Sequence, residues 1–226
     1  MIEISNLSKS YGKYKVLGNL NLSLPSGKII GIVGANGAGK STLFKCIHGT
    51  ETFDGSITSE FENLRTKIGM LETNPIMLSM ITGEEYLILH CNARKLPVPD
   101  LKDMNMFDLP LKNFASNYST GMKKKLALTA ILIQNNEVFI LDEPFNGVDL
   151  QSNLKLKSTF VTLREQGKTV LISSHIFSTL SEICDEIHLI QNGEISMSAD
   201  KSTYGELEAV LARTRESNTE NQTQHA

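Results

Sequence analysis

The stretch Gly34-Ala-Asn-Gly-Ala-Gly-Lys40-Ser41-Thr42 decides the fold that the sequence predicts, because it fits the phosphate-binding pattern G-x-x-x-x-G-K-[ST]. Glycines at its two fixed positions permit a tight turn whose successive backbone N–H groups hold phosphate oxygens. Lys40 adds a positive charge near the β- and γ-phosphates, and the Ser41 hydroxyl can ligate Mg²⁺. The expected nucleotide contacts are Gly34, Asn36, Gly37, Ala38, Gly39, Lys40, Ser41 and Thr42.

The residues on either side of this loop support the same interpretation. Ile29–Val33 is a short β-branched run that predicts a strand, and Ser41–His48 predicts a helix. That helix would offer the positive end of its dipole to the bound anion. A glycine-rich turn without a ligand is the alternative, but a chain of this length matches the pattern by chance only roughly 1% of the time.

Composition limits the possible classes of function. Apolar residues make up 40% and charged residues 21% of the 226 residues, and the formal charge of -3 gives no basic footprint, so we expect no nucleic-acid partner. No apolar run approaches the roughly 20 residues of a membrane span, and Met1–Ser5 does not resemble a secretory signal. Cys46, Cys91 and Cys184 are widely spaced, so we expect free thiols in a reducing cytosol.

A second chemical signature is the apolar run Val138–Leu141, followed by Asp142, Glu143 and Pro144. Consecutive large apolar residues predict a strand buried on both faces of a parallel sheet, and the proline ends it. The carboxylates then lie at the C-terminal end of the strand, where α/β sheets place their ligand sites. Asp142 suits a Mg²⁺ ligand, and Glu143 suits a base that accepts a proton from the attacking water. Carboxylates that only cap a helix are the alternative.

Two further side chains have both a functional and a structural interpretation. His175 follows the predicted strand Thr169–Ser173 and can donate a hydrogen bond to a γ-phosphate, or it can be a histidine with a structural role only. Tyr11 can offer its ring to a stacking base, or it can pack at the end of a strand.

The helix predicted over Lys123–Gln134 has lysines at its start. Ser119 and Thr120 fit N-cap chemistry, and the first turn then contains Lys123, Lys124 and Lys125. The helix dipole disfavours cations there, so a bound anion would offset the repulsion. Three solvated lysines are the simpler interpretation, because long charged side chains usually keep their ammonium groups in water.

The order of the predicted elements defines an α/β fold with a mainly parallel sheet. Alternating apolar residues over 2–7 and 20–24 predict antiparallel-type strands ahead of the nucleotide-binding unit. Residues 74–118, with approximate limits, predict a helix and are broken by prolines, so we interpret them as a small helical insertion. Residues 1–205 then form one domain, and 206–226 hold the end of a C-terminal helix and a polar tail predicted to be disordered.

Taken in order, these motifs resemble the ATP-binding subunit of an ABC transporter over nearly the whole chain. After the phosphate loop come the insertion, Tyr118–Met122, Ile140–Pro144, Gly147–Asp149 and Ser174-His175. The resemblance implies a P-loop NTPase core with an N-terminal antiparallel β subdomain, ATP and Mg²⁺ as ligands, and ATP hydrolysis coupled to transport. The form of Tyr118–Lys123 looks most like exporter-type subunits that pair with a separately encoded permease.

The resemblance also implies roles for single residues and partners. Tyr11 matches the aromatic residue that stacks on adenine, and Asp149 matches a loop that crosses the dimer interface. Ser119 and Gly121 match the signature loop, which contacts the γ-phosphate held by the other subunit. Two subunits would therefore meet head to tail and bind a transmembrane permease at the cytoplasmic face of the cell membrane. The implied catalytic residues are Lys40, Glu143 and His175.

Two departures from the family pattern are visible. Thr73, with Glu72 beside it, occupies the position of a glutamine that usually reaches Mg²⁺ or the attacking water, so either residue could replace it. The expected metal ligands are therefore Ser41, Asp142 and Thr73. Thr120 and Met122 replace the usual glycine and glutamine of the signature loop. The alternatives are a catalytically impaired subunit of a heterodimeric transporter and a soluble ABC-type ATPase acting on ribosomes or DNA.

Overall fold

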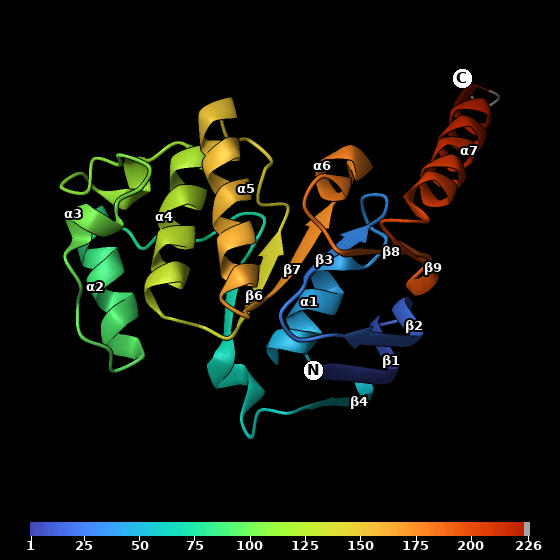
Figure 1. The fold of residues 1–226 in the computed structure, drawn as a ribbon, viewed down its shortest axis with the longest axis horizontal. Coiled ribbons are helices and arrows are strands. Elements are labelled where there is room, and N and C mark those ends of the chain that lie inside the picture. The colour runs from blue at the N-terminus through green and yellow to red at the C-terminus, as the bar shows by residue number, and fades with distance from the viewer. Residues whose placement is uncertain (224–226) are drawn as a thin grey trace.

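The computed structural model describes the backbone of residues 1–223 and the side chains of residues 1–213, arranged as two sheets with surrounding helices (Figure 1). The strands are β1 (Ile2–Tyr11), β2 (Tyr14–Leu24), β3 (Ile29–Val33), β4 (Asp54–Ser59), β5 (Ile68–Leu71), β6 (Val138–Asp142), β7 (Thr169–Ser174), β8 (Glu186–Gln191) and β9 (Glu194–Asp200). The α-helices are α1 (Lys40–His48), α2 (Gly83–Ala93), α3 (Leu101–Met104), α4 (Thr120–Ile133), α5 (Leu150–Glu165), α6 (Phe177–Ser181) and α7 (Tyr204–Thr223), and 3₁₀ turns cover η1 (Leu64–Lys67) and η2 (Ala115–Asn117).

The larger sheet carries the nucleotide-binding unit and is mainly parallel. Its order is β5-β6-β7-β3-β8-β9, with parallel pairing as far as β8 and an antiparallel edge at β9. In β3, Ile29 and Val33 pack into one apolar cluster while Ile30 and Ile32 pack into the other, because successive side chains of a strand point to opposite faces. Both faces of the sheet are therefore buried, as the continuous apolar runs predict.

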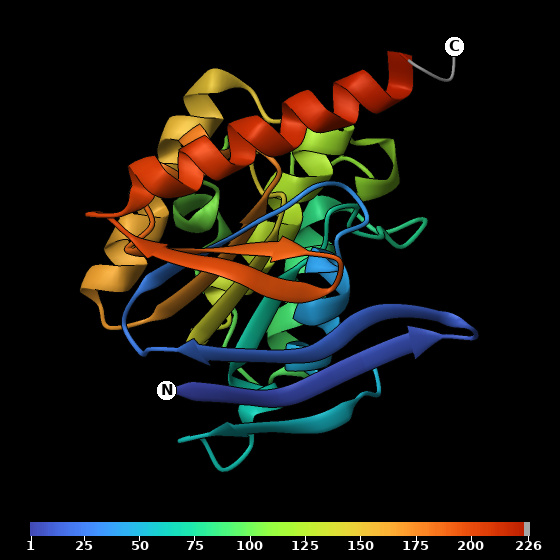
Figure 2. The ribbon, with the colours of Figure 1, turned by 90° about the vertical axis from the view of Figure 1, so that its right-hand side faces the viewer.

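Each face of this sheet has its own cover. On one face α1 lies between the large sheet and the small antiparallel sheet, whose order is β2-β1-β4 and whose strands run side by side (Figure 2). On the other face α4, α5 and α6 contribute apolar residues to the cluster that contains Ile29 and Val33. The arrangement confirms the predicted α/β fold with an N-terminal antiparallel β part, and it brings the C-terminal ends of β3, β6 and β7 to one edge.

The stretch interpreted as an insertion contains α2, α3 and η2. Thr82 begins α2 with a capping box: its hydroxyl accepts from the Glu85 N–H at 3.2 Å, and the Glu85 carboxylate accepts from the Thr82 N–H at 2.7 Å. These two reciprocal bonds satisfy backbone donors that would otherwise lack partners at a helix start. Helix α2 therefore begins at the capping residues Thr82 and Glu85.

The C-terminal part differs from its prediction. Helix α7 continues past Glu216 to Thr223, where the sequence predicts a tail without regular structure, and residues 224–226 lie outside the described part. The polar stretch after Gly205 contains no further glycine or proline, so nothing in it breaks a helix. Leu207 is fully buried in the core, so the first turns of α7 belong to the packed domain.

The three cysteines are buried and free, as their spacing predicts. Burial raises the pKa of the Cys46 thiol to about 11 and also raises the pKa values of Cys91 and Cys184. Within residues 1–223, none of the helices combines the length and the apolar character that crossing a membrane requires.

Candidate active site

The phosphate loop joins β3 to α1 and ends at Gly39, which has a φ of 107° and forms the N-cap of the helix. A Cβ at Gly39 would lie 2.7 Å from Cδ2 of Leu17, so both conformation and space require glycine. The helix has no side-chain cap and no acidic residue in its first turn. Its N–H groups and positive dipole end are therefore available to an anion.

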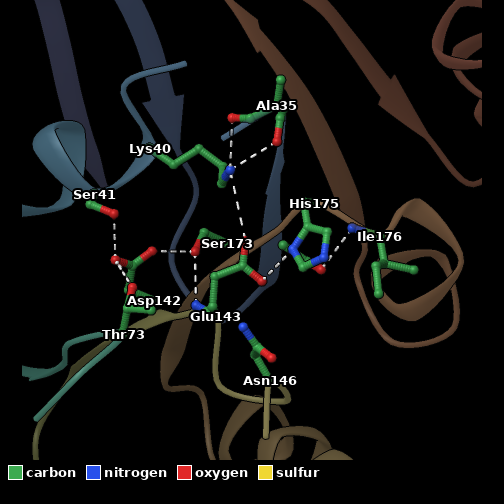
Figure 3. A network of polar contacts seen from close by, with 12 residues as sticks. Ala35, Lys40, Ser41, Thr73, Asp142, Glu143, Asn146, Ser173, His175 and Ile176 are labelled. Atoms are coloured by element: carbon green, nitrogen blue, oxygen red, sulfur yellow. Dashed lines mark hydrogen bonds and ion pairs between the residues drawn. The ribbon is translucent and has the colours of Figure 1, made fainter. Parts of the chain in front are cut away.

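Lys40 lies inside this loop rather than in solvent. Its side chain is only 7% exposed, and Nζ donates to the carbonyl oxygens of Gly34 at 2.8 Å and Ala35 at 3.1 Å (Figure 3). Nζ also lies 3.8 Å from Oε1 of Glu143. The ammonium group is therefore fixed between the loop and the carboxylate, where it can meet the terminal phosphates of a nucleotide.

Asp142, at the end of β6, is the acceptor for three hydroxyl groups and is 3% exposed. Ser41 Oγ and Thr73 Oγ1 both donate to its Oδ2, at 2.6 and 2.7 Å, and Ser173 Oγ donates to Oδ1 (Figure 3). No motif in the sequence singles out Ser173. It lies directly opposite Asp142 in the β6–β7 register.

The oxygens around Asp142 fit a Mg²⁺ ion that also binds phosphate. The described residues hold no group of three or more His, Cys, Asp and Glu side chains that could hold a metal by themselves. Mg²⁺ is typically bound by one or two carboxylates together with waters and substrate phosphates. One carboxylate with the Ser41 and Thr73 hydroxyls, next to a phosphate-binding loop, is a donor set of this kind.

Glu143 directs its carboxylate into the same space. Its φ is 49°, a conformation that costs energy for a residue with a side chain. Its N–H donates to Ser173 Oγ at 2.9 Å, and its Oε2 lies 3.0 Å from Nδ1 of His175. Its Oε1 is buried and has no hydrogen-bond partner among the described residues, although Lys40 lies nearby. A buried carboxylate oxygen of this kind can accept a proton from a water molecule.

One cleft of about 480 Å³ joins most of the predicted site residues. It is lined by Asn36, Gly37, Gly39, Lys40, Ser41, Thr42, Thr73, Glu143 and His175, together with Val16 and Asn146. A hollow of about 500 Å³ continues along the other side of the loop past Gly34 and Ala38 to Leu211 of α7. The first cleft suits phosphate groups, because it contains Lys40 and Ser41 and opens onto the Glu143 carboxylate.

Tyr11 lies next to the cleft rather than in its lining. The ring, at the end of β1, is 44% exposed, and the Lys9 ammonium lies 4.8 Å from the ring centroid. Partial burial and hydrogen bonding with Glu51 raise the Tyr11 pKa, while Thr42 lowers it. The contact with Thr42 places the ring beside the first turn of α1, which suits a base held beyond the phosphates.

The predicted signature residues lie on another part of the molecule. Ser119 caps α4 by accepting from the Met122 N–H at 3.3 Å, and neither Ser119 nor Gly121 lines the cleft. A Cβ at Gly121 would lie 2.6 Å from the carbonyl oxygen of Gly147. The start of α4 therefore packs tightly on the loop that follows Glu143.

Asp149 ends that loop and caps α5. Its carboxylate accepts from the Ser152 N–H at 2.9 Å and from the Lys125 ammonium at 2.5 Å. Lys125 is the main reason that the pKa of Asp149 lies far below its usual range, and the Ser152 hydrogen bonds add to the effect. The side chain is 58% exposed, so it also remains accessible from outside.

The interpretation of the three lysines at the start of α4 as solvated is wrong for Lys124, which is buried. Its side chain is 3% exposed, and Nζ donates to the carbonyl oxygens of Glu143 at 2.9 Å and Asn146 at 2.8 Å. Burial lowers its pKa, while the charges of Glu143 and Asp142 oppose that shift. A signal existed in the sequence: Lys124 lies three and four residues before Ala127 and Leu128, on the apolar face of the helix.

Known proteins have similar sequences and the same fold. The BcrA protein of Enterococcus faecalis, named as a bacitracin transport ATP-binding protein, is 34% identical over 86% of this chain and 68% of its own length. SrtF of Streptococcus pyogenes, a lantibiotic transport ATP-binding protein, is 32% identical over 93% of this chain and 96% of its own. A solved ATP-binding subunit of an ABC transporter superposes with a TM-score of 0.81 at 25% identity, covering 94% of this chain and 99% of that one.

Three more comparisons agree. LnrL of Bacillus subtilis, a linearmycin resistance ATP-binding protein, is 31% identical over 86% of this chain and 68% of its own length. An ATP-binding cassette solved as a dimer with ADP and phosphate has the same fold, with a TM-score of 0.79 at 20% identity. The family described as ABC transporter matches residues 17–146, more than half of the chain. The chain belongs to the ABC transporter family, as an ATP-binding subunit that hydrolyses ATP.

Proposed function

We propose that this subunit powers an exporter whose permease is a separate chain, and that Lys40, Asp142 and Glu143 carry the ATPase reaction. The observation that supports it most is their convergence: a buried ammonium, a buried carboxylate that accepts from three hydroxyls, and a carboxylate with one oxygen that accepts no hydrogen bond from the described residues share one small region. Phosphoryl transfer depends mainly on positioning and on electrostatic stabilisation, which such an arrangement supplies.

In this proposal the phosphates lie on the loop and on the N-terminus of α1, with Lys40 beside the β- and γ-phosphates. Glu143 accepts the proton of the attacking water through Oε1, which lies 3.8 Å from Lys40. His175, 3.0 Å from Glu143, donates to the γ-phosphate and orients the carboxylate. Ser41, Thr73 and Asp142 would hold Mg²⁺, and an ion bound there would neutralise negative charge on the phosphate oxygens.

A head-to-tail dimer explains why the signature residues lie outside the cleft. Ser119 and Gly121 stand at the exposed start of α4, where they could complete the phosphate site of a second copy. In such a twofold arrangement the same two patches are used twice. Asp149 would then lie at the crossing point of the two subunits, with part of its side chain accessible.

The permease is proposed to bind between Thr73 and α2, at the cytoplasmic face of the membrane. Three apolar side chains on this segment are strongly exposed: Ile76 at 79%, Leu78 at 50% and Met80 at 82%. Exposed apolar groups gathered in one segment are typical of an interaction surface. Because Thr73 is hydrogen-bonded to Asp142, a contact made on this segment has a short path along the chain to the proposed metal site.

Export as the direction of transport is supported by the resemblance of Tyr118–Lys123 to exporter-type subunits. The names of three relatives, which refer to bacitracin transport, lantibiotic transport and linearmycin resistance, point the same way. A catalytically impaired partner of a heterodimer is the second candidate, motivated by Thr73 in place of glutamine. The Thr73–Asp142 hydrogen bond favours the active subunit, because the hydroxyl still reaches the proposed metal site.

Two variants test the proposal together. Lys40→Ala should abolish ATP binding measured by equilibrium dialysis, because the phosphates lose their buried ammonium. Glu143→Gln should keep ATP binding but lower turnover about 100- to 10,000-fold, the range for loss of a general base. It should also accumulate as an ATP-bound dimer in gel filtration. A Glu143→Gln protein that stays monomeric with wild-type turnover would exclude Glu143 as the base.

A further inference from the structure

Lys124 is the most deeply buried lysine of the described chain, and its ammonium group faces backbone oxygens rather than a carboxylate. Charged side chains are rarely buried unless they are paired, because removing an ammonium from water is costly. Here two carbonyl oxygens, at 2.8 and 2.9 Å, take up two of its three donors. The Lys124 ammonium therefore binds a specific stretch of backbone.

The two carbonyl oxygens belong to Glu143 and Asn146, on the loop that carries the proposed base. Glu143 has a φ of 49°, which a residue with a side chain adopts only when its surroundings impose it. Its N–H is held by Ser173 Oγ at 2.9 Å, and its carbonyl oxygen is held by Lys124 at 2.9 Å. The backbone of the proposed base is therefore fixed on both sides of its Cα, by two different elements.

We propose that Lys124 is a positioning residue for the ATPase reaction: its ammonium holds the backbone of Glu143 so that the carboxylate points between Lys40 and His175. The inference rests on the proposed function, in which Glu143 is the base. A displacement of the order of 1 Å in a reacting group can cost about 100-fold in rate. Losing the two hydrogen bonds would release Glu143 toward an ordinary backbone conformation and turn its carboxylate away.

The same contact ties the start of α4 to this loop. Gly121 packs so closely on Gly147 that an added Cβ would lie 2.6 Å from the Gly147 carbonyl oxygen. The Lys125 ammonium donates to the Asp149 carboxylate. Lys124 lies between Gly121 and Lys125 in the sequence, and its ammonium donates to the backbone of Glu143, the proposed base. The first turn of α4 and the loop that starts at Glu143 therefore form one packed unit.

The test compares steady-state ATP hydrolysis by the full-length chain and three variants. Lys124→Met keeps the length of the side chain but has no donor, so kcat should fall about 10- to 100-fold while the KM for ATP changes less than about threefold. Lys124→Gln, with one shorter donor group, should be intermediate in kcat at the same KM. It also keeps the test valid if Lys124→Met does not fold.

Lys168→Met is the matched control. Lys168 is 15% exposed and pairs with Glu137 at 3.0 Å, at the opposite ends of β6 and β7 from Glu143. This variant also loses a partly buried ammonium contact, so it reports the effect of reduced stability alone. Its kcat should stay within twofold of the unmodified chain. A fall as large as that of Lys124→Met would overturn the positioning role.

A parallel assay of Glu143→Gln separates the two ideas. If Glu143→Gln is inactive while Lys124→Met keeps full kcat, the positioning role is overturned and the proposed function stands. If Glu143→Gln keeps wild-type turnover, the proposed base is wrong and the positioning role fails with it. A rise in KM at constant kcat in Lys124→Met would show a role in nucleotide binding and would also overturn the inference.

Discussion

The hydroxyl of Thr73 donates to Oδ2 of Asp142 at 2.7 Å, from a loop position where the family usually has glutamine. The sequence leaves open whether Thr73 or Glu72 takes over that position. In the structure Glu72 is exposed and pairs with Lys45, with its Oε1 4.0 Å from Nζ, whereas Thr73 contacts Asp142. A shorter side chain therefore keeps an oxygen beside the carboxylate proposed to bind Mg²⁺.

Thr73→Val should weaken the response to Mg²⁺ without removing ATP binding. The substitution keeps the shape of the side chain but removes the hydroxyl, and a hydrogen bond of this kind is worth about 1 kcal/mol, or roughly fivefold. The Mg²⁺ concentration for half-maximal hydrolysis should rise by about that factor. Glu72→Gln is the control and should leave the Mg²⁺ dependence within twofold. The opposite ranking of the two variants would assign the position to Glu72.

Gly121→Ala should destabilise the fold and impair hydrolysis. Its Cβ would lie 2.6 Å from the Gly147 carbonyl oxygen, and backbone atoms cannot move aside as a flexible side chain can. Overpacking of this kind costs about 1–3 kcal/mol in the free energy of unfolding, measurable by urea denaturation. Gly205→Ala, in α7, would place its methyl group where no atom lies within 4 Å, so it should be neutral or slightly stabilising. Equal stability of the two variants would refute the close contact.

The Lys125–Asp149 pair should give an acid-dependent contribution to stability. Because the folded-state pKa of Asp149 is depressed, its charge stabilises the fold above the ordinary aspartate value near 4. The contribution is lost as the pH falls through the depressed value. Asp149→Asn keeps an N-cap residue but removes the charge. Its unfolding free energy should be lower than that of the unmodified chain at pH 7, and the difference should shrink steadily below about pH 4.

Tyr11→Ala should weaken ATP binding by about tenfold, since stacking of a base on an aromatic ring is worth about 1–3 kcal/mol. Tyr11→Phe keeps the ring and loses only the hydroxyl that interacts with Glu51 and Thr42, so its affinity should stay within threefold. Titration calorimetry with ATP and with tripolyphosphate provides the decisive comparison. Tripolyphosphate has no base, so a loss of its affinity in Tyr11→Ala would contradict the stacking role.

The parts of the fold that the sequence predicts well are those with strong local patterns. The apolar run Val138–Leu141 predicts a strand buried on both faces, and β6 is buried at every position. The prediction succeeds because strands of a parallel sheet that is covered on both faces are apolar throughout. The phosphate loop is predicted well because few other local structures require its combination of two spaced glycines, a lysine and a serine. In α7 the polar composition is misleading, since a polar stretch without glycine or proline is still able to form a helix.

The parts of the site that the sequence does not predict depend on tertiary contacts. Ser173 reaches Asp142 because β6 and β7 pair in one particular register, which neither strand determines alone. Lys124 is buried because the loop after Glu143 folds back over α4 and offers two carbonyl oxygens. Its position on the apolar face of the helix was a usable signal. The identity of its partners was not, because backbone oxygens leave no trace in a sequence.

The burial of Cys46, Cys91 and Cys184 has a practical consequence for studying the dimer. Thiols that are enclosed and held in their protonated form react slowly with maleimides and disulfide-forming reagents. The unmodified chain therefore serves as a low-background template for crosslinking. Cysteines introduced at Asn36 and Ser119 would be the reactive pair, and a bond between copies that forms only with ATP would trap the head-to-tail arrangement covalently.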